Sequence, residues 1–214
     1  MEDLLNKLCG FGVVPVVALD DPQKAVQTAR AFIEGGLPCA EIVFRTQAAE
    51  ESIRLVSQEF PQMLLGAGTV LTTRQADQAI DAGAKFVVAP GLNPKVVEHC
   101  LSKKIPIIPG CVTPSEIEEA IELGLDFVKF FPAEAAGGIK MLKALSAPYP
   151  NVKFMPTGGI DLNNLCTYLA FDKVIACGGS WMTPKEHINS GNFVEISMLA
   201  KEAASAVKKL RGAR

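Results

Sequence analysis

Short apolar runs alternate with longer amphipathic segments from one end of the chain to the other. Each run is strand-sized and is bounded by turn residues or charged residues, which is typical of buried β-strands. The runs recur at intervals of about 19 to 27 residues, with a segment of helical character between them. The predicted strands are Val13–Leu19, Ala40–Phe44, Met63–Gly68, Phe86–Ala89, Ile105–Ile108, Phe127–Phe131, Phe154–Pro156 and Val174–Cys177.

Several of the intervening segments begin or end with helix-capping residues. Asp21-Pro22 combines an N-cap with a proline at the first helical position, and Thr113-Pro114-Ser115-Glu116 starts another helix. Gly83 and Gly124 follow helical stretches, as glycines at helix C-termini do. The clearest predicted helices are Pro22–Glu34, Thr73–Ala82, the segment from Thr113-Pro114 to Leu123, Asp161–Ala170 and Asn192–Leu210.

The order of these elements predicts an α/β fold in a single domain of residues 1–214. Strands that alternate with helices imply right-handed crossovers and a parallel sheet. Eight such units in 214 residues fit a minimal (β/α)8 TIM barrel. The alternative, an open doubly wound sheet, usually has a glycine-rich turn after its first strand, and residues 18–22 contain no glycine. We expect Met1–Gly12 to form a short N-terminal helix that covers the bottom of the barrel.

Composition narrows the classes of function. The formal net charge is -2 and no basic stripe with interleaved aromatics occurs, so nucleic acid is not an expected partner. No apolar run approaches the roughly 18 residues of a membrane helix, and the start at Met1-Glu2-Asp3 is not typical of a signal peptide. Six scattered cysteines without a CxxC pair predict reduced thiols in a cytoplasmic protein. His99 and His187 are too far apart to suggest a metal site.

Lys129 is the most informative residue, because it interrupts the apolar run Phe127–Phe131. Charged ammonium groups are costly to bury, and a buried amine tends to lose its proton. An uncharged amine is the nucleophile that attacks a carbonyl to form a Schiff base. The alternative is a lysine whose stem lies along the core while its head reaches water.

Polar residues and glycines follow several of the predicted strands, at the end where the active sites of TIM barrels lie. With period-two alternation, Glu41, Val43 and Arg45 point to one side of the second strand. A carboxylate inside a barrel needs a partner or a function; a structural Glu41–Arg45 ion pair is the alternative to a catalytic role.

After the third strand, Gly66-Ala67-Gly68 permits close backbone approach and Thr69 offers a hydroxyl. The segments Ala89-Pro90-Gly91 and Pro109-Gly110-Cys111 are weak signals that also fit plain turns.

Two Gly-Gly pairs follow the seventh and eighth predicted strands. They lie in Thr157-Gly158-Gly159 and Gly178-Gly179-Ser180. Bare backbone N–H groups in such loops bind anions, and phosphorylated ligands dock after these two strands in many barrels. Turns often contain glycine, so either pair alone is weak, but together they predict a phosphate site.

The sequence closely resembles the 2-keto-3-deoxy-6-phosphogluconate (KDPG) and 4-hydroxy-2-oxoglutarate (KHG) aldolases. The matching segments span nearly the whole chain in order, and the lysine motif is the specific one. They are Glu41 to Thr46, Gly66 to Leu71, Ala89 to Leu92, Ile108 to Gly110, Phe127 to Glu134, Pro156 to Ile160 and Gly178 to Trp181.

This resemblance implies a class I aldolase on a (β/α)8 barrel, without a metal or other cofactor and commonly a homotrimer. It implies that Lys129 forms the Schiff base, that Glu41 shuttles protons, and that Arg45 and Thr69 bind the pyruvyl end. It also implies that the substrate contacts Pro90, Phe131 and Thr157. The residues expected to bind its phosphate are Gly158, Gly159, Gly179 and Ser180. The expected reaction is cleavage of KDPG to pyruvate and glyceraldehyde 3-phosphate, with KHG as a second substrate that would give pyruvate and glyoxylate.

Two departures from the family pattern leave the substrate preference open. Family members often have threonine where this chain has Val43, and a small or aliphatic residue where it has Cys111. The candidate substrates are KDPG, KHG and the galactonate-derived isomer of KDPG.

Two rival functions would use the same glycine loops. One is a phosphosugar isomerase or epimerase, which needs paired acids or a metal. The other is a non-catalytic phosphometabolite sensor, which does not need Lys129, Glu41 and Arg45 together.

Overall fold

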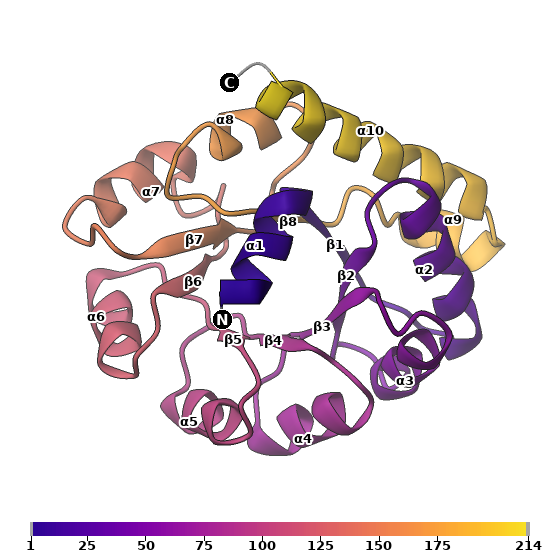
Figure 1. Ribbon diagram of the computed structural model, residues 1–214, viewed down its shortest axis with the longest axis horizontal. Coiled ribbons are helices and arrows are strands. Elements are labelled where there is room, and N and C mark those ends of the chain that lie inside the picture. The colour runs from indigo at the N-terminus through magenta and orange to yellow at the C-terminus, as the bar shows by residue number, and fades with distance from the viewer. Residues whose placement is uncertain (1, 213–214) are drawn as a thin grey trace.

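The computed structural model describes residues 2–212 and has alternating strands and helices (Figure 1). The strands are β1 (Val13–Val17), β2 (Cys39–Val43), β3 (Leu64–Gly68), β4 (Phe86–Val88), β5 (Ile107–Ile108), β6 (Phe127–Phe130), β7 (Lys153–Pro156) and β8 (Cys177–Gly179). The helices are α1 (Glu2–Phe11), α2 (Ala25–Glu34), α3 (Ala49–Glu59), α4 (Thr73–Asp81), α5 (Pro94–Ser102), α6 (Pro114–Glu122), α7 (Gly138–Ser146), α8 (Leu165–Leu169), α9 (Lys185–Ser190) and α10 (Phe193–Gly212), with a 3-10 turn at Pro22–Lys24. Each predicted strand overlaps an observed strand, and each predicted helix overlaps an observed helix.

The strands curl around a common centre, and the helices that follow them lie outside (Figure 1). Six strands form one parallel sheet in the order β5-β4-β3-β2-β1-β8, and β6 and β7 form a parallel pair. Single parallel bridges join the pair to the larger sheet on both sides: Gly110 pairs with Lys129, and Thr157 pairs with Gly178. The result is an α/β fold with a curled parallel sheet, in which the carboxyl ends of the strands face the same way.

The last strand differs most from its prediction. It begins at Cys177, where the predicted strand Val174–Cys177 ends. Val174 makes only a single bridge, to Phe154 of β7, whereas Cys177 and Gly178 pair with Val13 and Val14 of β1. The apolar run therefore brings the chain to the sheet, and the glycines that follow it form the strand.

Two helix starts were also predicted too early. Asp161 is not helical, because its carboxylate accepts hydrogen bonds from the backbone N–H groups of Asn163 and Asn164 and so forms a turn before α8. Pro22–Lys24 is a 3-10 turn capped by the Asp21 side chain, and regular helix begins at Ala25. The helix start predicted at Thr113-Pro114 is confirmed, and the structure shows a full capping box there, with Glu116 as the partner of Thr113.

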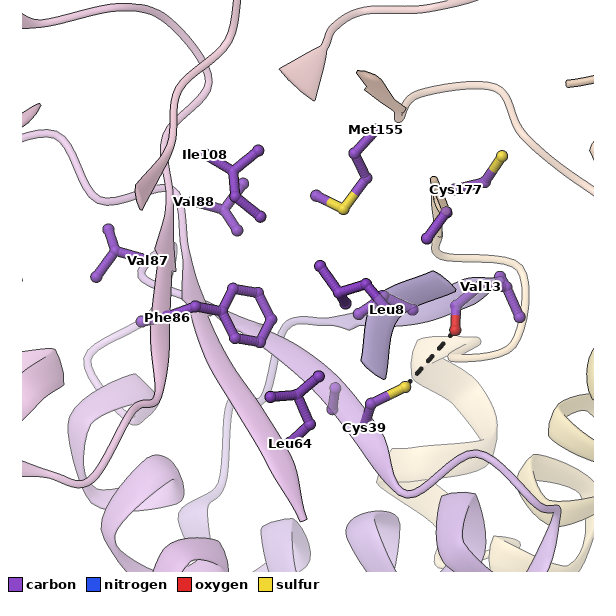
Figure 2. Packing of buried hydrophobic residues seen from close by; sticks show 14 of the residues in the cluster. Leu8, Val13, Cys39, Leu64, Phe86, Val87, Val88, Ile108, Met155 and Cys177 are labelled. Carbon is purple, nitrogen blue, oxygen red and sulfur yellow. Dashed lines mark hydrogen bonds between the residues drawn. The ribbon is translucent and has the colours of Figure 1, made fainter. Parts of the chain in front are cut away.

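Helix α1 fills the N-terminal end of the curled sheet, as predicted for Met1–Gly12; Met1 itself lies outside the described residues. Leu4 and Leu8 are buried, and Figure 2 shows Leu8 among side chains from the starts of the strands. Val13, Cys39, Leu64 and Phe86 are the labelled neighbours from β1 to β4. This end of the sheet is thus closed by apolar packing. Within the described part of the chain, no helix has both the length and the apolar character needed to cross a membrane.

Candidate active site

Lys129 and Glu41 form a buried ion pair inside the curled sheet. Lys129 lies in β6 and is 4% exposed, whereas Glu41 lies in β2 and is fully buried. The Lys129 Nζ is 3.4 Å from Glu41 Oε1. The amine therefore does not reach bulk water, in contrast to the surface-reaching alternative considered for this lysine. The partner of Glu41 is Lys129, and not Arg45 as a structural ion pair would require.

The geometry of this pair leaves polar capacity unused. A separation of 3.4 Å is long for a charge-assisted hydrogen bond, which usually spans about 2.7–2.9 Å. Glu41 Oε2 is buried and accepts no hydrogen bond from residues 2–212. Such an atom is costly to bury unless a ligand or a water molecule completes its hydrogen bonding. Both groups are thus placed to interact with a third group.

A glycine in the neighbouring strand makes the space for the Glu41 carboxylate. Gly68 ends β3, which pairs with β2. A methyl group added to Gly68 would lie 2.1 Å from Glu41 Oε1 and 2.7 Å from its Cδ atom. The predicted need for close approach in this segment is therefore confirmed, and the group that approaches is a side chain of the protein.

Arg45 and Thr69 meet at the carboxyl ends of β2 and β3. Arg45 is exposed and donates from Nε to Thr69 Oγ1 across 3.2 Å. Thr69 has a φ of 55°, which costs energy for a β-branched residue. Hydrogen bonds from Phe44 N to Gly68 O and from Val70 N to Val88 O flank this residue and hold its backbone. Strain at a position that presents a hydroxyl toward an arginine is typical of a functional site.

A cavity of about 180 Å³ brings most of the predicted site residues together. Its lining comes from the carboxyl ends of the strands and consists of Val16, Arg45, Phe131, Thr157, Gly158, Gly159, Ile160, Gly178 and Ser180. The Phe131 ring connects this cavity with the buried pair, because its centroid is 5.2 Å from Lys129 Nζ. Val16 and Ile160 were missed in the sequence; the alternation of the first strand was the signal that could have identified Val16.

The backbone of residues 158–160 presents unpaired N–H groups. Gly158 and Gly159 have φ values of 99° and 78°, which favour glycine. Their carbonyl oxygens are occupied, since Glu134 N donates to Gly158 O and Asn164 Nδ2 donates to Gly159 O. Gly158 N–H faces Gly178 through the bridge between Thr157 and Gly178, whereas within residues 2–212 the N–H groups of Gly159 and Ile160 donate to no protein acceptor. Consecutive free N–H groups of this kind form an anion-binding nest.

The second Gly-Gly pair is placed differently from the prediction. Gly178 and Gly179 belong to β8 rather than to a loop, and they are glycines because side chains pack on them. An added Cβ at Gly178 would lie 2.4 Å from Thr157 Oγ1, and one at Gly179 would lie 1.8 Å from the Trp181 ring. Gly178 and Ser180 line the cavity, whereas Gly179 does not, so the phosphate contact of Gly179 stays a prediction.

Three further residues named in the sequence analysis lie around the site. The Pro90 carbonyl contacts the backbone of Gly110: a Cβ added to Gly110 would lie 2.0 Å from Pro90 O. Val43 and Cys111 are fully buried. Burial, reinforced by Glu116 and Glu119, raises the pKa of the Cys111 thiol to about 12, and the thiol donates to Glu116 O across 3.5 Å. Cys111 thus packs as a neutral group.

A larger groove, of about 640 Å³, lies far from these residues. It runs between the end of α1, the end of α2 and the last turns of α10, with Gly10, Gly35 and Lys208 among its lining. None of the predicted site residues lines it. The smaller cavity therefore has six of the predicted site residues in its lining, and Lys129 and Glu41 lie buried behind Phe131.

Comparison with known proteins agrees with the resemblance. The family model for KDPG and KHG aldolases matches residues 4–199. The 2-dehydro-3-deoxy-phosphogluconate aldolase of Treponema pallidum is 53% identical over 91% of this chain and 93% of its own length. The KHG/KDPG aldolase of Escherichia coli is 40% identical over 92% of each chain.

Solved structures of such enzymes have the same fold. A KDPG aldolase from Legionella pneumophila, with pyruvate captured as a covalent carbinolamine intermediate, superposes with a TM-score of 0.90 at 38% identity and covers 93% of this chain and 97% of its own. A KDPG aldolase from Zymomonas mobilis with 3-phosphoglycerate gives a TM-score of 0.87 at 37% identity and covers 94% of each chain. The chain belongs to the KDPG and KHG aldolase family.

Proposed function

We propose that this protein is a class I aldolase that cleaves KDPG to pyruvate and glyceraldehyde 3-phosphate. The observation that carries the proposal is the buried amine of Lys129, 3.4 Å from a carboxylate that has a free oxygen. The covalent pyruvate carbinolamine of the Legionella pneumophila relative supports a lysine nucleophile in this family. Arg45 and the nest at residues 158–160 line one cavity, which supports a substrate that is anionic at both ends.

We infer further that the two sheets form one closed (β/α)8 barrel within a single domain of residues 1–214. The bridges Gly110–Lys129 and Thr157–Gly178, on either side of the β6–β7 pair, support closure. Active sites of such barrels lie at the carboxyl ends of the strands, where Arg45, Thr69 and Gly158 lie here. A homotrimer remains the proposed assembly, and its test is the mass of the protein in solution.

The proposed reaction begins at the C2 carbonyl of the substrate. Once Lys129 has lost its proton, its amine adds to C2 and forms a carbinolamine. The carbinolamine takes up one proton and loses water to give an iminium, and this proton is released again when the iminium is hydrolysed. Glu41, through one water molecule, removes the proton of the C4 hydroxyl, and the C3–C4 bond breaks. Its electrons move to the iminium, which becomes an enamine, and glyceraldehyde 3-phosphate leaves. The iminium supplies the electron withdrawal that a Lewis acid supplies in metal-assisted reactions.

Glu41 then completes the cycle. It returns a proton to C3 of the enamine, which restores the iminium, and addition of water releases pyruvate and the free amine of Lys129. A positioned carboxylate that acts as base and then as acid typically contributes about 10²- to 10⁴-fold to the rate. The free Oε2 of Glu41 is available for this exchange.

The two ends of the substrate would bind at opposite sides of the amine. Arg45 suits the keto-acid carboxylate because its guanidinium forms two parallel hydrogen bonds, and Thr69 orients that guanidinium. The N–H groups of residues 158–160 and the Ser180 hydroxyl suit the phosphate. We propose that Pro90, Phe131 and Thr157 contact the substrate between its two charged ends. The 3-phosphoglycerate in the Zymomonas mobilis structure supports a site for a three-carbon phosphate in this family.

KHG is a second candidate substrate, because the Escherichia coli relative is named for both compounds. Its cleavage would use Lys129 and Glu41 in the same way, and its second carboxylate, attached directly to C4, would lie closer to Lys129 than the phosphate of KDPG does. Val43 and Cys111 are fully buried, so they would affect the preference only through packing. Steady-state rates on KDPG, KHG and the galactonate-derived isomer would establish the preference.

Borohydride reduction in the presence of pyruvate tests the proposed function. The wild type should gain a covalent adduct, detectable by mass spectrometry, and Lys129→Ala should gain none and lose aldol cleavage completely. Lys153→Ala is the matched control, since Lys153 starts β7 at the opposite end of the strands and its amine donates to Asp172 O. Equal labelling of wild type and Lys129→Ala would contradict the proposal. An isomerase or a sensor would give no adduct at all.

A further inference from the structure

The loop after β6 packs against the anion nest at residues 158–160 and is hydrogen-bonded to it. Ala133 N donates to Thr157 O across 2.8 Å, and Glu134 N donates to Gly158 O across 3.0 Å. The stem of Glu134 packs on the next residue of the nest, because a Cβ added to Gly159 would lie 2.7 Å from Glu134 Cβ. The shape of the nest therefore depends on where the Glu134 side chain lies.

The carboxylate of Glu134 is held by Tyr168. The hydroxyl of this tyrosine donates to Glu134 Oε1, and among residues 2–212 it is the one hydrogen-bond donor to that carboxylate. Tyr168 is 1% exposed and lies in α8, the helix that follows the nest. Burial, reinforced by Glu134, raises the pKa of the Tyr168 phenol far above neutrality, so it donates throughout the physiological range.

This hydrogen bond turns the charge away from the cavity. The carboxylate lies beside Gly138 at the start of α7, where an added Cβ would be 3.1 Å from Glu134 Oε1 and 3.4 Å from the Tyr168 hydroxyl. The N-terminus of a helix stabilises a negative charge. Glu134 does not line the cavity, although Gly159 does, and the residue is exposed. Without Tyr168 the carboxylate could swing toward the nest.

We propose that Tyr168 and Glu134 are a positioning pair that makes the site selective for phosphorylated substrates, by holding the Glu134 carboxylate away from the substrate phosphate. A carboxylate and a phosphate repel each other, most strongly where solvent is excluded. The stem of Glu134 supports the nest, and the tyrosine controls where its charge lies. This inference rests on the proposed function, in which residues 158–160 bind the phosphate.

The test compares a phosphorylated substrate with one that lacks the phosphate. Tyr168→Phe should raise the KM for KDPG by about fivefold to tenfold, the upper part of the range for one typical intramolecular hydrogen bond. Its kcat for KDPG, its KM for KHG and its pyruvate adduct with borohydride should stay within about twofold of the wild type. Because the defect is electrostatic, it should shrink as KCl is raised.

Two further variants separate this role from a merely structural one. Tyr168→Phe combined with Glu134→Gln should recover the wild-type KM for KDPG, since an amide does not repel phosphate. Tyr149→Phe is the matched control: it removes the other tyrosine–glutamate hydrogen bond, from Tyr149 to Glu118 at 3.0 Å, and should leave every constant unchanged.

Three results would overturn the proposal while leaving the aldolase assignment intact. They are an unchanged KM for KDPG in Tyr168→Phe, an equal rise for KDPG and KHG, and no recovery in the double variant. The borohydride adduct shows whether each variant is folded at the active site. If Tyr168→Phe does not fold, Glu134→Gln alone decides: its KM for KDPG should be equal to or below the wild-type value, and a rise would contradict the inference. A wild type that gives no adduct would instead contradict the proposed function.

Discussion

The two ends of the curled sheet are built from the same strands and differ in what they bury. At the N-terminal end, Leu8 of α1 packs among Leu64, Phe86 and Val13 (Figure 2). At the other end, β2 and β6 bury Glu41 and Lys129. Strand β2 shows the contrast within a single element, since it begins with Cys39 in the apolar end and carries Glu41 two residues later. One end stabilises the fold, and the other holds groups that the fold alone does not need.

Polar atoms follow the same division. Burial raises the pKa of the Cys39 thiol far above neutrality, so Cys39 is neutral at the apolar end, and it donates to Val13 O across 3.6 Å. At the C-terminal end, Glu41 Oε2 is buried without a donor, and the N–H groups of Gly159 and Ile160 lack a protein acceptor within the described chain. Unsatisfied polar groups destabilise a protein by about 1–3 kcal/mol each when buried. Their concentration at one end marks where a ligand is expected to complete them.

Replacement of Glu41 by glutamine should give the strongest contrast between the ends. The amide is nearly isosteric but cannot take up a proton, so we expect turnover to fall by about 10²- to 10⁴-fold. The borohydride adduct with pyruvate should still form, because Lys129 remains. The free energy of unfolding, measured in urea, is the control. Normal turnover in this variant would show that the proton shuttle lies elsewhere.

Leu8→Ala tests the opposite end. Leu8 is fully buried at the centre of the apolar packing, so we expect a loss of about 2 to 5 kcal/mol in the free energy of unfolding. The kcat of the folded fraction should stay within about twofold of the wild type. Leu101→Ala is the matched control, because Leu101 lies in α5 and is 39% exposed; its cost should be below about 0.5 kcal/mol. A large loss of kcat with unchanged stability would contradict this division.

Gly68→Ala should damage the catalytic end through shape alone. The new methyl group would lie 2.1 Å from Glu41 Oε1, so the carboxylate must move. A displacement of about 1 Å at a reacting group costs on the order of 10²-fold in rate. Steady-state kcat on KDPG measures this loss, and a crystal structure of the variant would show the moved carboxylate. A rate equal to the wild type would mean that Glu41 tolerates the displacement.

Gly10→Ala provides the comparison for that variant at the other end. Gly10 lies in α1, and an added Cβ would meet no atom within 4 Å. Alanine favours helix over glycine, so stability should rise by up to about 1 kcal/mol while kcat stays unchanged. A loss of stability would indicate that α1 packs more tightly at this position than the structure indicates.

Much of the fold could be predicted because the evidence for it is local. The apolar runs identified the strands, and Thr113-Pro114 identified the start of α6, where the structure shows a full capping box. Asp21-Pro22 placed the start of α2 too early, because residues 22–24 form a 3-10 turn. The prediction for the last strand was displaced because Cys177–Gly179 ends in two glycines, which carry no apolar signal. Its position follows from pairing with Val13 and Val14 of β1, which are distant in sequence.

The candidate site was predictable in part for the same reason. A lysine inside an apolar run is visible in the sequence, and so are the glycines beside Thr157. The pair Glu134 and Tyr168 was missed, because an acidic residue in a loop and an aromatic residue in a helix are ordinary in isolation. Only the packing of α8 against the loop after β6 brings the hydroxyl to the carboxylate.

The sequence alone determined which segments are buried strands, which are helices, and that an amine lies within an apolar strand. The tertiary structure decided which polar atoms meet. Lys129 and Glu41 are 88 residues apart, and their contact depends on strand register and on the absence of a side chain at Gly68. Hydrophobic periodicity reports burial and secondary structure because both depend on neighbouring residues. The distance between two polar atoms on separate strands depends on how the whole sheet curls, and no local pattern encodes it.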